Sequence, residues 1–182
     1  YGIDSEQSHA LRMQTPLPGI DFDAGVMQTP SRGVECMQSN GSGMLLPVGS
    51  INPALPGWRE DLRRCHQDYR MHAIRLHPNY HGYALDADEC EELSSLAKKH
   101  RLVVQIALNM EDVRMHHPLM QVPNVDVAPL QGLVERHPEL RLIVMNNYGT
   151  IGSDAAAQLT AAGKVYFEIS HAERVGALET LV

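Results

Sequence analysis

Four side chains suited to acid–base and anion-binding chemistry lie within one short stretch, Ala73 to Tyr83. They are Arg75, His77, Tyr80 and His81. The stretch begins as an apolar run and ends in polar residues, which is typical of a buried parallel strand that places active side chains at its carboxyl end. An imidazole there can serve as a general base or as a metal ligand. The alternative is a solvent-exposed loop that is rich in histidine.

Pro78 separates the two histidines of this stretch. Because proline lacks an N–H group and restricts the residue before it, we expect no helix to run through this position. His77 and His81 are therefore not predicted to form a helical i, i+4 pair, although both can project into one pocket. The structural alternative for His77 is a hydrogen bond to a neighbouring carbonyl group.

Arg75 lies between Ile74 and Leu76 in the apolar run. A buried guanidinium group needs a carboxylate partner or a ligand anion. Two interpretations follow: Arg75 binds a substrate, or it forms a salt bridge with Glu168 or Asp112.

A second polar cluster, Glu111 to Pro118, follows the clearest predicted strand, Leu102 to Leu108. Arg114 is suited to bind a substrate carboxylate through two hydrogen bonds. Neighbouring histidines point in different directions on most backbones, so we expect only His117 to face a pocket. Gln105, inside the strand, contacts either a ligand or another core group, because a buried amide must be hydrogen-bonded. The alternative for the cluster is a charged loop in solvent.

Further candidates follow the last two predicted strands. Asn146 and Asn147 either bind substrate or serve only as turn residues. His171 can add a third imidazole. We expect the carboxyl ends of successive strands to bring His77, Arg114 and Asn147 around one shared site. The predicted catalytic residues are His77, Arg114 and His117, and the predicted substrate-binding residues are Arg75, Tyr80, His81, Gln105, Asn146 and Asn147.

Apolar runs alternate with segments of helical spacing along most of the chain. The predicted strands are 24–29, 44–51, 73–76, 102–108, 140–145 and 165–169. The predicted helices are 58–69, 127–136, 172–182 and two segments that end near residues 100 and 163. Asp86 or Asp88 is expected to cap the segment that ends near 100, and Ser153 or Asp154 the segment that ends near 163. This pattern predicts a parallel sheet with helices packed outside it, either doubly wound or most of a barrel. No Gly-x-Gly-x-x-Gly fingerprint follows any predicted strand, which argues against a dinucleotide-binding fold.

The length and composition limit the class of protein. The chain has 182 residues, a formal net charge of −7 and 43% hydrophobic residues, so we predict a single domain over residues 1–182, in which residues 1–23 have no clear place. An acidic chain lacks the basic face that a nucleic-acid partner needs. No apolar run reaches the length of a membrane span. Cys36, Cys65 and Cys90 have no metal-binding spacing, and we interpret them as reduced thiols in a cytoplasmic protein.

Several motifs resemble those of amidohydrolase-related proteins, a family that includes lactonases and decarboxylases similar to aminocarboxymuconate-semialdehyde decarboxylase. The motifs are Gly49-Ser50-Ile51-Asn52-Pro53, Trp58-Arg59-Glu60-Asp61-Leu62, Ile74-Arg75-Leu76-His77-Pro78, Leu102 to Leu108, Glu111-Asp112-Val113-Arg114, His117-Pro118 and Leu140 to Gly149. The resemblance implies a (β/α)8 TIM barrel. We expect the chain to be incomplete, with about six of eight βα units present, because such barrels usually need about 250 residues.

The resemblance also implies a divalent metal, with zinc as the first expectation. Relatives hold it with a His-x-His on the first strand, histidines that end strands five and six, and an aspartate on strand eight. The strand-five and strand-six positions fall near Ala107 and Asn147 here. Alanine cannot bind a metal and asparagine is a weak donor, so the residues present do not support the implied site. A metal would need other ligands, such as His77, His81, His117 or His171.

We therefore expect an amidohydrolase-like hydrolase that acts on a small carboxylate, lactone or amide, or a related non-oxidative decarboxylase. The alternative is a non-catalytic barrel domain that binds a small acidic ligand or a partner subunit. Because an incomplete barrel exposes two sheet edges, we also expect a homo-oligomer. We expect no nucleic-acid or membrane partner.

Overall fold

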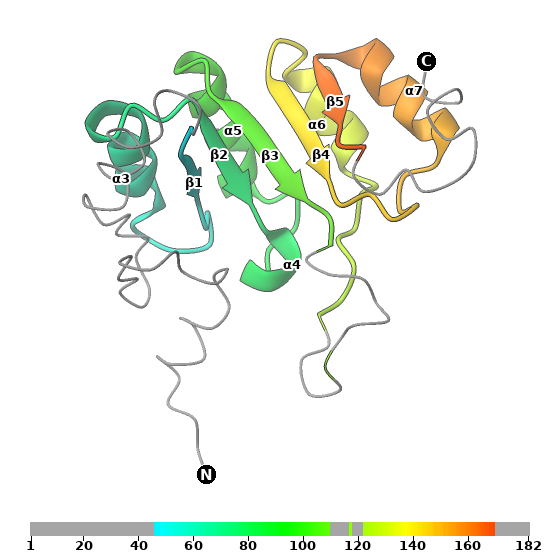
Figure 1. Cartoon of the computed structure of the whole chain (residues 1–182), viewed down its shortest axis with the longest axis horizontal. Coiled ribbons are helices and arrows are strands. Elements are labelled where there is room, and N and C mark those ends of the chain that lie inside the picture. The colour runs from blue at the N-terminus through cyan, green and yellow to red at the C-terminus, as the bar shows by residue number, and fades with distance from the viewer. Residues whose placement is uncertain (1–45, 110–116, 118–121, 170–182) are drawn as a thin grey trace.

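A computed structural model describes residues 46–109, 117 and 122–169 (Figure 1). Within these ranges the strands form one parallel five-stranded sheet in the order β1-β2-β3-β4-β5. The strands are β1 (Val48–Ser50), β2 (Ala73–Leu76), β3 (Val103–Ala107), β4 (Arg141–Met145) and β5 (Val165–Phe167). The helices are α3 (Trp58–Arg63), the π-helix η1 (Arg64–Asp68), α4 (Pro78–His81), α5 (Asp88–Lys99), α6 (Leu130–Arg136) and α7 (Ser153–Ala162).

The strand order decides between the two predicted architectures. A doubly wound sheet reverses its strand order near the middle, whereas this sheet adds each new strand on the same side of the previous one. Right-handed crossovers then place the longer connecting helices on one face of the sheet, whereas the short helix α4 lies at the carboxyl ends of the strands. Figure 1 shows α5 and α6 behind the strands accordingly. This is the arrangement of a TIM barrel that is not closed within the described residues.

The two faces of the sheet differ in burial. Ile74, Val104 and Leu142 are buried on the face that the helices cover. The opposite face, which we call the inner face, carries Arg75, Gln105, Ile143 and Tyr166 in register. Tyr166 is 56% exposed, so described residues cover this face only in part.

The core lies between the sheet and its helices. Its largest fully buried side chains include Trp58, Ile74, Leu93, Leu102 and Leu130. Apolar residues at helical spacing on α5 and α6 and at alternate positions of the strands account for this layer. Among the described helices, none has both the length and the apolar character needed to cross a membrane.

All predicted strands and helices within the described ranges are present, although most of their ends differ. The predicted strand 24–29 and helix 172–182 lie outside the described residues. The predicted helix caps are wrong: Ala87 precedes α5 and Gly152 precedes α7, and neither helix start has a side-chain cap. Ser153 is already the first residue of its helix.

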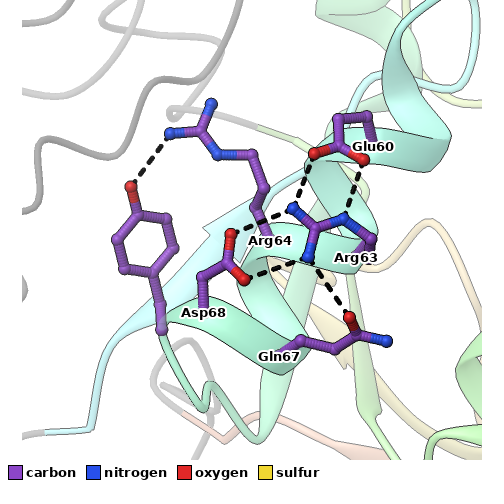
Figure 2. A network of polar contacts seen from close by, with 6 residues as sticks. Glu60, Arg63, Arg64, Gln67 and Asp68 are labelled. Carbon is purple, nitrogen blue, oxygen red and sulfur yellow. Dashed lines mark hydrogen bonds and ion pairs between the residues drawn. The ribbon is translucent and has the colours of Figure 1, made fainter.

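The predicted helix 58–69 changes to a π-helix after Arg63. Figure 2 shows that the Arg63 guanidinium group lies at this change, where it donates to Glu60, Gln67 and Asp68. Next to it, Arg64 donates to the Tyr69 hydroxyl group at 3.1 Å. Most of these groups are exposed, and exposed ion pairs contribute little stability, so the network fixes the local geometry and adds little free energy.

Candidate functional site

Arg75 and Gln105 form the polar centre of the inner face. They are opposite each other in the register of β2 and β3, and Arg75 Nε donates to Gln105 Oε1 at 2.8 Å. Burial lowers the pKa of the half-buried Arg75, and the Glu168 carboxylate opposes this shift. The guanidinium group therefore stays charged while it is partly removed from water. Among the described residues, no acceptor is bonded to its terminal nitrogens.

Glu168 lies on the same face as Arg75, at the β5 edge of the described sheet. It follows β5, and its N–H donates to Val144 O at 2.9 Å, which extends the strand ladder by one bond. Side chains alternate along a strand, so Glu168 shares the inner face with Tyr166. Two strands separate β2 from β5 along the sheet, a path of about 14 Å at normal strand spacing. The Glu168 charge counters the effect of burial on the pKa of Arg75.

His77 and His81 lie together at the end of β2, and the prediction that they are not a helical i, i+4 pair was wrong. Pro78 is the first residue of the short helix α4, with His77 as its N-cap, and His81 N donates to His77 O at 2.9 Å. Proline suits this position because its missing N–H group would have no partner in the first turn. One helical turn thus brings the two imidazoles together, with ring centroids 5.7 Å apart in an edge-to-face arrangement.

The environment of His77 favours its neutral form. Burial, followed by the charges of His81 and Arg75, lowers the pKa of His77 to about 4. At neutral pH the imidazole is therefore unprotonated and has a free lone pair, but the low pKa makes it a weak base. Tyr83, whose ring lies 6.2 Å from that of His81, closes the other side of this group. Burial raises the pKa of Tyr83 well above its usual value of 10, so it remains protonated.

The ends of β3 and β4 are joined by two asparagines in a reciprocal arrangement, which we call the amide clamp. Asn109 Nδ2 donates to Asn146 O at 3.0 Å, and Asn146 Nδ2 donates to Asn109 O at 2.5 Å. Asn146 has a φ of 54°, in the left-handed region that asparagine tolerates better than most residues. Its N–H donates to Glu168 Oε2 at 3.0 Å. The clamp therefore also fixes the Glu168 carboxylate.

Asn147 has the turn role that is one of its two interpretations from the sequence. Its Nδ2 donates to Ile151 O at 2.9 Å, and its Oδ1 accepts from Ile151 N at 2.8 Å. These bonds close the loop before α7. Substrate binding by Asn147 stays a prediction, but its amide already holds the loop.

The other predicted site residues are only partly described. Tyr80 is half-buried on α4, and His117 is exposed. Arg114, Asp112 and His171 lie outside the described residues. The structure thus brings Arg75, Gln105 and the α4 histidines to one region, whereas the predicted meeting of His77, Arg114 and Asn147 stays a prediction.

Two polar residues of this region were not predicted as site residues. Asn109 is 8% exposed and belongs to the amide clamp, and Glu168 was considered only as a salt-bridge partner of Arg75. A polar residue directly after a buried strand was the available signal for both. Asn146 is predicted from this signal, and Asn109, which follows the strand that ends at Leu108, carries the same signal.

The fold and this polar inner face are those of the TIM-barrel class, and comparison with known proteins identifies the family. The amidohydrolase family model matches residues 13–181, so the chain belongs to the amidohydrolase family. A solved structure of an uncharacterised TIM-barrel protein from Bordetella bronchiseptica is similar, with a TM-score of 0.56 and 13% sequence identity. The similarity covers 75% of this chain and 47% of that one, so this chain spans about half the length of that protein. No curated protein matches the sequence.

The described residues do not fit the metal site that the family implies. No three histidine, cysteine or acidic side chains converge on one point within the described ranges. Ala107, which ends β3, has no donor atom, and Asn147 uses its amide on Ile151. We therefore derive no reaction step through a metal.

Proposed function

We propose that this chain is part of an amidohydrolase-like hydrolase that acts on a small carboxylate-bearing lactone or amide. The observation that carries the proposal is Arg75, a half-buried cation on the inner face whose Nε is held by Gln105. This bond fixes the plane of the guanidinium group. Its terminal nitrogens then match the two oxygens of a carboxylate, a geometry that gives strong and directional binding.

His77 is the general base in this proposal. As the neutral imidazole accepts a proton from water, the water oxygen forms a bond to the carbonyl carbon of the substrate. The carbonyl electron pair moves to its oxygen, and the tetrahedral intermediate collapses with release of an alcohol or amine. The proton returns to that leaving group from His77. Arg75 holds the substrate in place through its carboxylate.

Substrate binding also makes His77 a better base. The positive charge of Arg75 is one cause of the low pKa of His77. A carboxylate bound to Arg75 offsets that charge, so the pKa of His77 rises towards the operating pH. A base is most effective when its pKa lies near that pH.

The remaining predicted residues have supporting roles in the proposal. Tyr80 and His81 line the substrate site beside His77, and Gln105 and Asn146 contribute polar contacts. Arg114 and His117 follow β3 in the sequence; in the proposal Arg114 binds a second polar group of the substrate and His117 assists in proton transfer.

Binding of a simple carboxylate tests the proposal. Propionate is titrated into the full-length protein, and the pKa of His77 is followed by NMR. We expect binding to raise this pKa, and Arg75→Met to abolish both binding and the change. Lys98→Met, which removes an exposed charge from α5, is the matched control and should alter neither. Propionate binding that is unaffected by Arg75→Met would refute the proposal.

A second candidate function has a specific observation in its favour. Ala107 and Asn147 stand near the positions where the family resemblance implies metal-binding histidines. This pattern suits a non-catalytic barrel domain that binds a small acidic ligand or a partner subunit. The two candidates differ in turnover: the enzyme hydrolyses an Arg75-dependent ligand, and the binding domain releases it unchanged.

We further propose a homo-oligomer in the cytoplasm. Within the described residues β1 and β5 are the sheet edges, and exposed edges favour pairing with another chain. Cys65 and Cys90 are buried free thiols, which suits a reducing compartment. Sedimentation of the full-length protein as a monomer at all concentrations would refute the oligomer.

A further inference from the structure

Helix α5 carries opposite charges at its two ends. Its first turn contains Asp88 and Glu89, and its last turn contains Lys98 and Lys99. All four side chains are exposed. The helix has 12 residues and a length of about 18 Å, so the two groups cannot pair with each other within one chain. The helix dipole favours this order of charges, so the order alone does not indicate a partner.

Arg101, directly after α5, is a second observation that the dipole does not explain. Its φ is 56°, and the N–H groups of Arg101 and Leu102 close the helix end by donating to Lys98 O and Ala97 O. Glycine is the usual residue at this left-handed position, because a Cβ there crowds the following carbonyl oxygen. The lysines of the last turn already supply positive charge to the dipole. An arginine in a position that favours glycine therefore indicates a use for its exposed guanidinium group.

A further exposed cation lies beside Arg101. Arg141, the first residue of β4, donates from Nη2 to the carbonyl oxygen of Arg101. Glu139, the acidic residue nearest to Arg141 in the sequence, is bonded to Lys164. We call the exposed cations of this region the basic end of α5: Lys98, Lys99, Arg101 and Arg141. Within the described ranges, none of them forms an ion pair.

The start of α5 has an excess of negative charge. Two of its carboxylates are bonded to arginines of neighbouring helices: Glu91 to Arg136, and Glu92 to Arg59. The Arg59 charge also acts on Glu89. We call the exposed carboxylates that remain the acidic end of α5: Asp86, Asp88 and Glu89. In the part of the chain that the structure describes, none of these forms an ion pair.

We propose that the outer face of α5 is a contact surface for a second copy of this chain, with the two α5 helices antiparallel. A two-fold axis across the middle of α5 places the acidic end of each copy against the basic end of the other. Ser95 is the exposed residue nearest the middle, and its small side chain permits close approach. Because both complementary groups lie on one helix, they favour a second copy over an acidic or a basic partner of another kind.

This contact rests on the proposed homo-oligomer and places its interface at α5 instead of at the sheet edges. Exposed ion pairs are individually weak, so the dimer should dissociate at micromolar or lower protein concentrations more readily as salt is added. A parallel arrangement of the helices would bring like charges together and is therefore disfavoured.

Charge reversal tests the proposal by analytical sedimentation of the full-length protein. Lys98→Glu/Lys99→Glu removes the net charge of the basic end, and Asp88→Lys/Glu89→Lys reverses the acidic end. Each double variant should weaken the dimer by on the order of tenfold, because both contacts of a two-fold dimer are affected. A mixture of the two variants should associate more tightly than either alone, since one contact regains opposite charges. Asp154→Lys reverses an exposed charge in the first turn of α7 and is the matched control.

Arg101→Gly separates docking from stability. Glycine relieves the left-handed backbone, so the urea midpoint should rise at a concentration at which the protein is monomeric, while the dimer weakens. This variant and the salt series keep the proposal testable if a double variant does not fold.

The outcomes distinguish this contact from the proposed homo-oligomer. A dimer that is unchanged by salt, by Arg101→Gly and by both double variants overturns the α5 contact and leaves an oligomer formed through another surface. A wild-type protein that is monomeric at all concentrations overturns both.

Discussion

The low pKa of His77 predicts a specific loss of stability in acid. The folded protein holds this pKa at about 4, whereas the unfolded chain has the ordinary value of 6.5. Between these values the unfolded state binds more protons, so the free energy of unfolding falls as the pH falls. The contribution of His77 to the free energy of unfolding is fully present above pH 6.5 and is lost as the pH falls towards 4. The gap between the two values corresponds to about 3 kcal/mol.

A comparison of two variants isolates this contribution from the other histidines and the acidic residues. The free energy of unfolding is measured by urea denaturation at neutral pH and near pH 4, for wild type, His77→Gln and His72→Gln. Glutamine does not titrate, so His77→Gln should lose about 3 kcal/mol less than wild type over this interval. His72 is exposed, and His72→Gln is the control for the replacement of a histidine outside this site. An equal loss in wild type and His77→Gln would refute a buried, neutral His77.

Three further predictions concern the structure around the site. Asn146→Ala should lower the free energy of unfolding by about 2 kcal/mol and Asn146→Gly by about 1 kcal/mol. Glycine keeps the left-handed backbone and loses only the clamp bond, whereas alanine loses the bond and strains the backbone. Equal losses in urea denaturation would contradict the backbone argument. Gly49→Ala should cost more than 1 kcal/mol by the same assay, since an added Cβ would overlap the Cys65 sulfur; a neutral result would show that the contact can relax. Burial raises the thiol pKa of Cys65 and Cys90 to about 12, so both should resist a thiol reagent until the protein unfolds; rapid labelling of the folded chain would contradict this burial.

The parallel sheet could be predicted because its strands are short apolar runs with a clear beginning and end. Val103 to Ala107 lies within the run Leu102 to Leu108, and the strand Ala73 to Leu76 has the predicted bounds. The choice between a doubly wound sheet and a barrel depends on strand order. Strand order is set by the packing of whole βα units, which local periodicity does not encode.

Local rules failed at the starts of three helices. Asp86 and Asp88 are good helix caps in isolation, but the chain enters α5 through Ala87 in an extended conformation, and Asp88 is already helical. Pro78 was interpreted as a helix breaker, although proline is favoured at the first position of a helix. A proline alone does not indicate which of these roles it has.

The site could be predicted in part, since polar residues after strands indicate the catalytic end of a parallel sheet. Arg75 and Gln105 were recognised because charged and amide groups are costly inside a strand. Their pairing depends on the register of β2 and β3, and the bond from Asn146 to Glu168 depends on the pairing of β4 with β5. Neither property can be read from residue types. The amide clamp was missed for the same reason.

The central claim is that Arg75 receives the carboxylate of the substrate on the inner face of the sheet. A crystal structure of the full-length protein with bound propionate tests it most directly. We predict both carboxylate oxygens within hydrogen-bonding distance of the terminal nitrogens of Arg75, with Nε still bonded to Gln105. A carboxylate bound elsewhere, with Arg75 directed away from it, would contradict the claim.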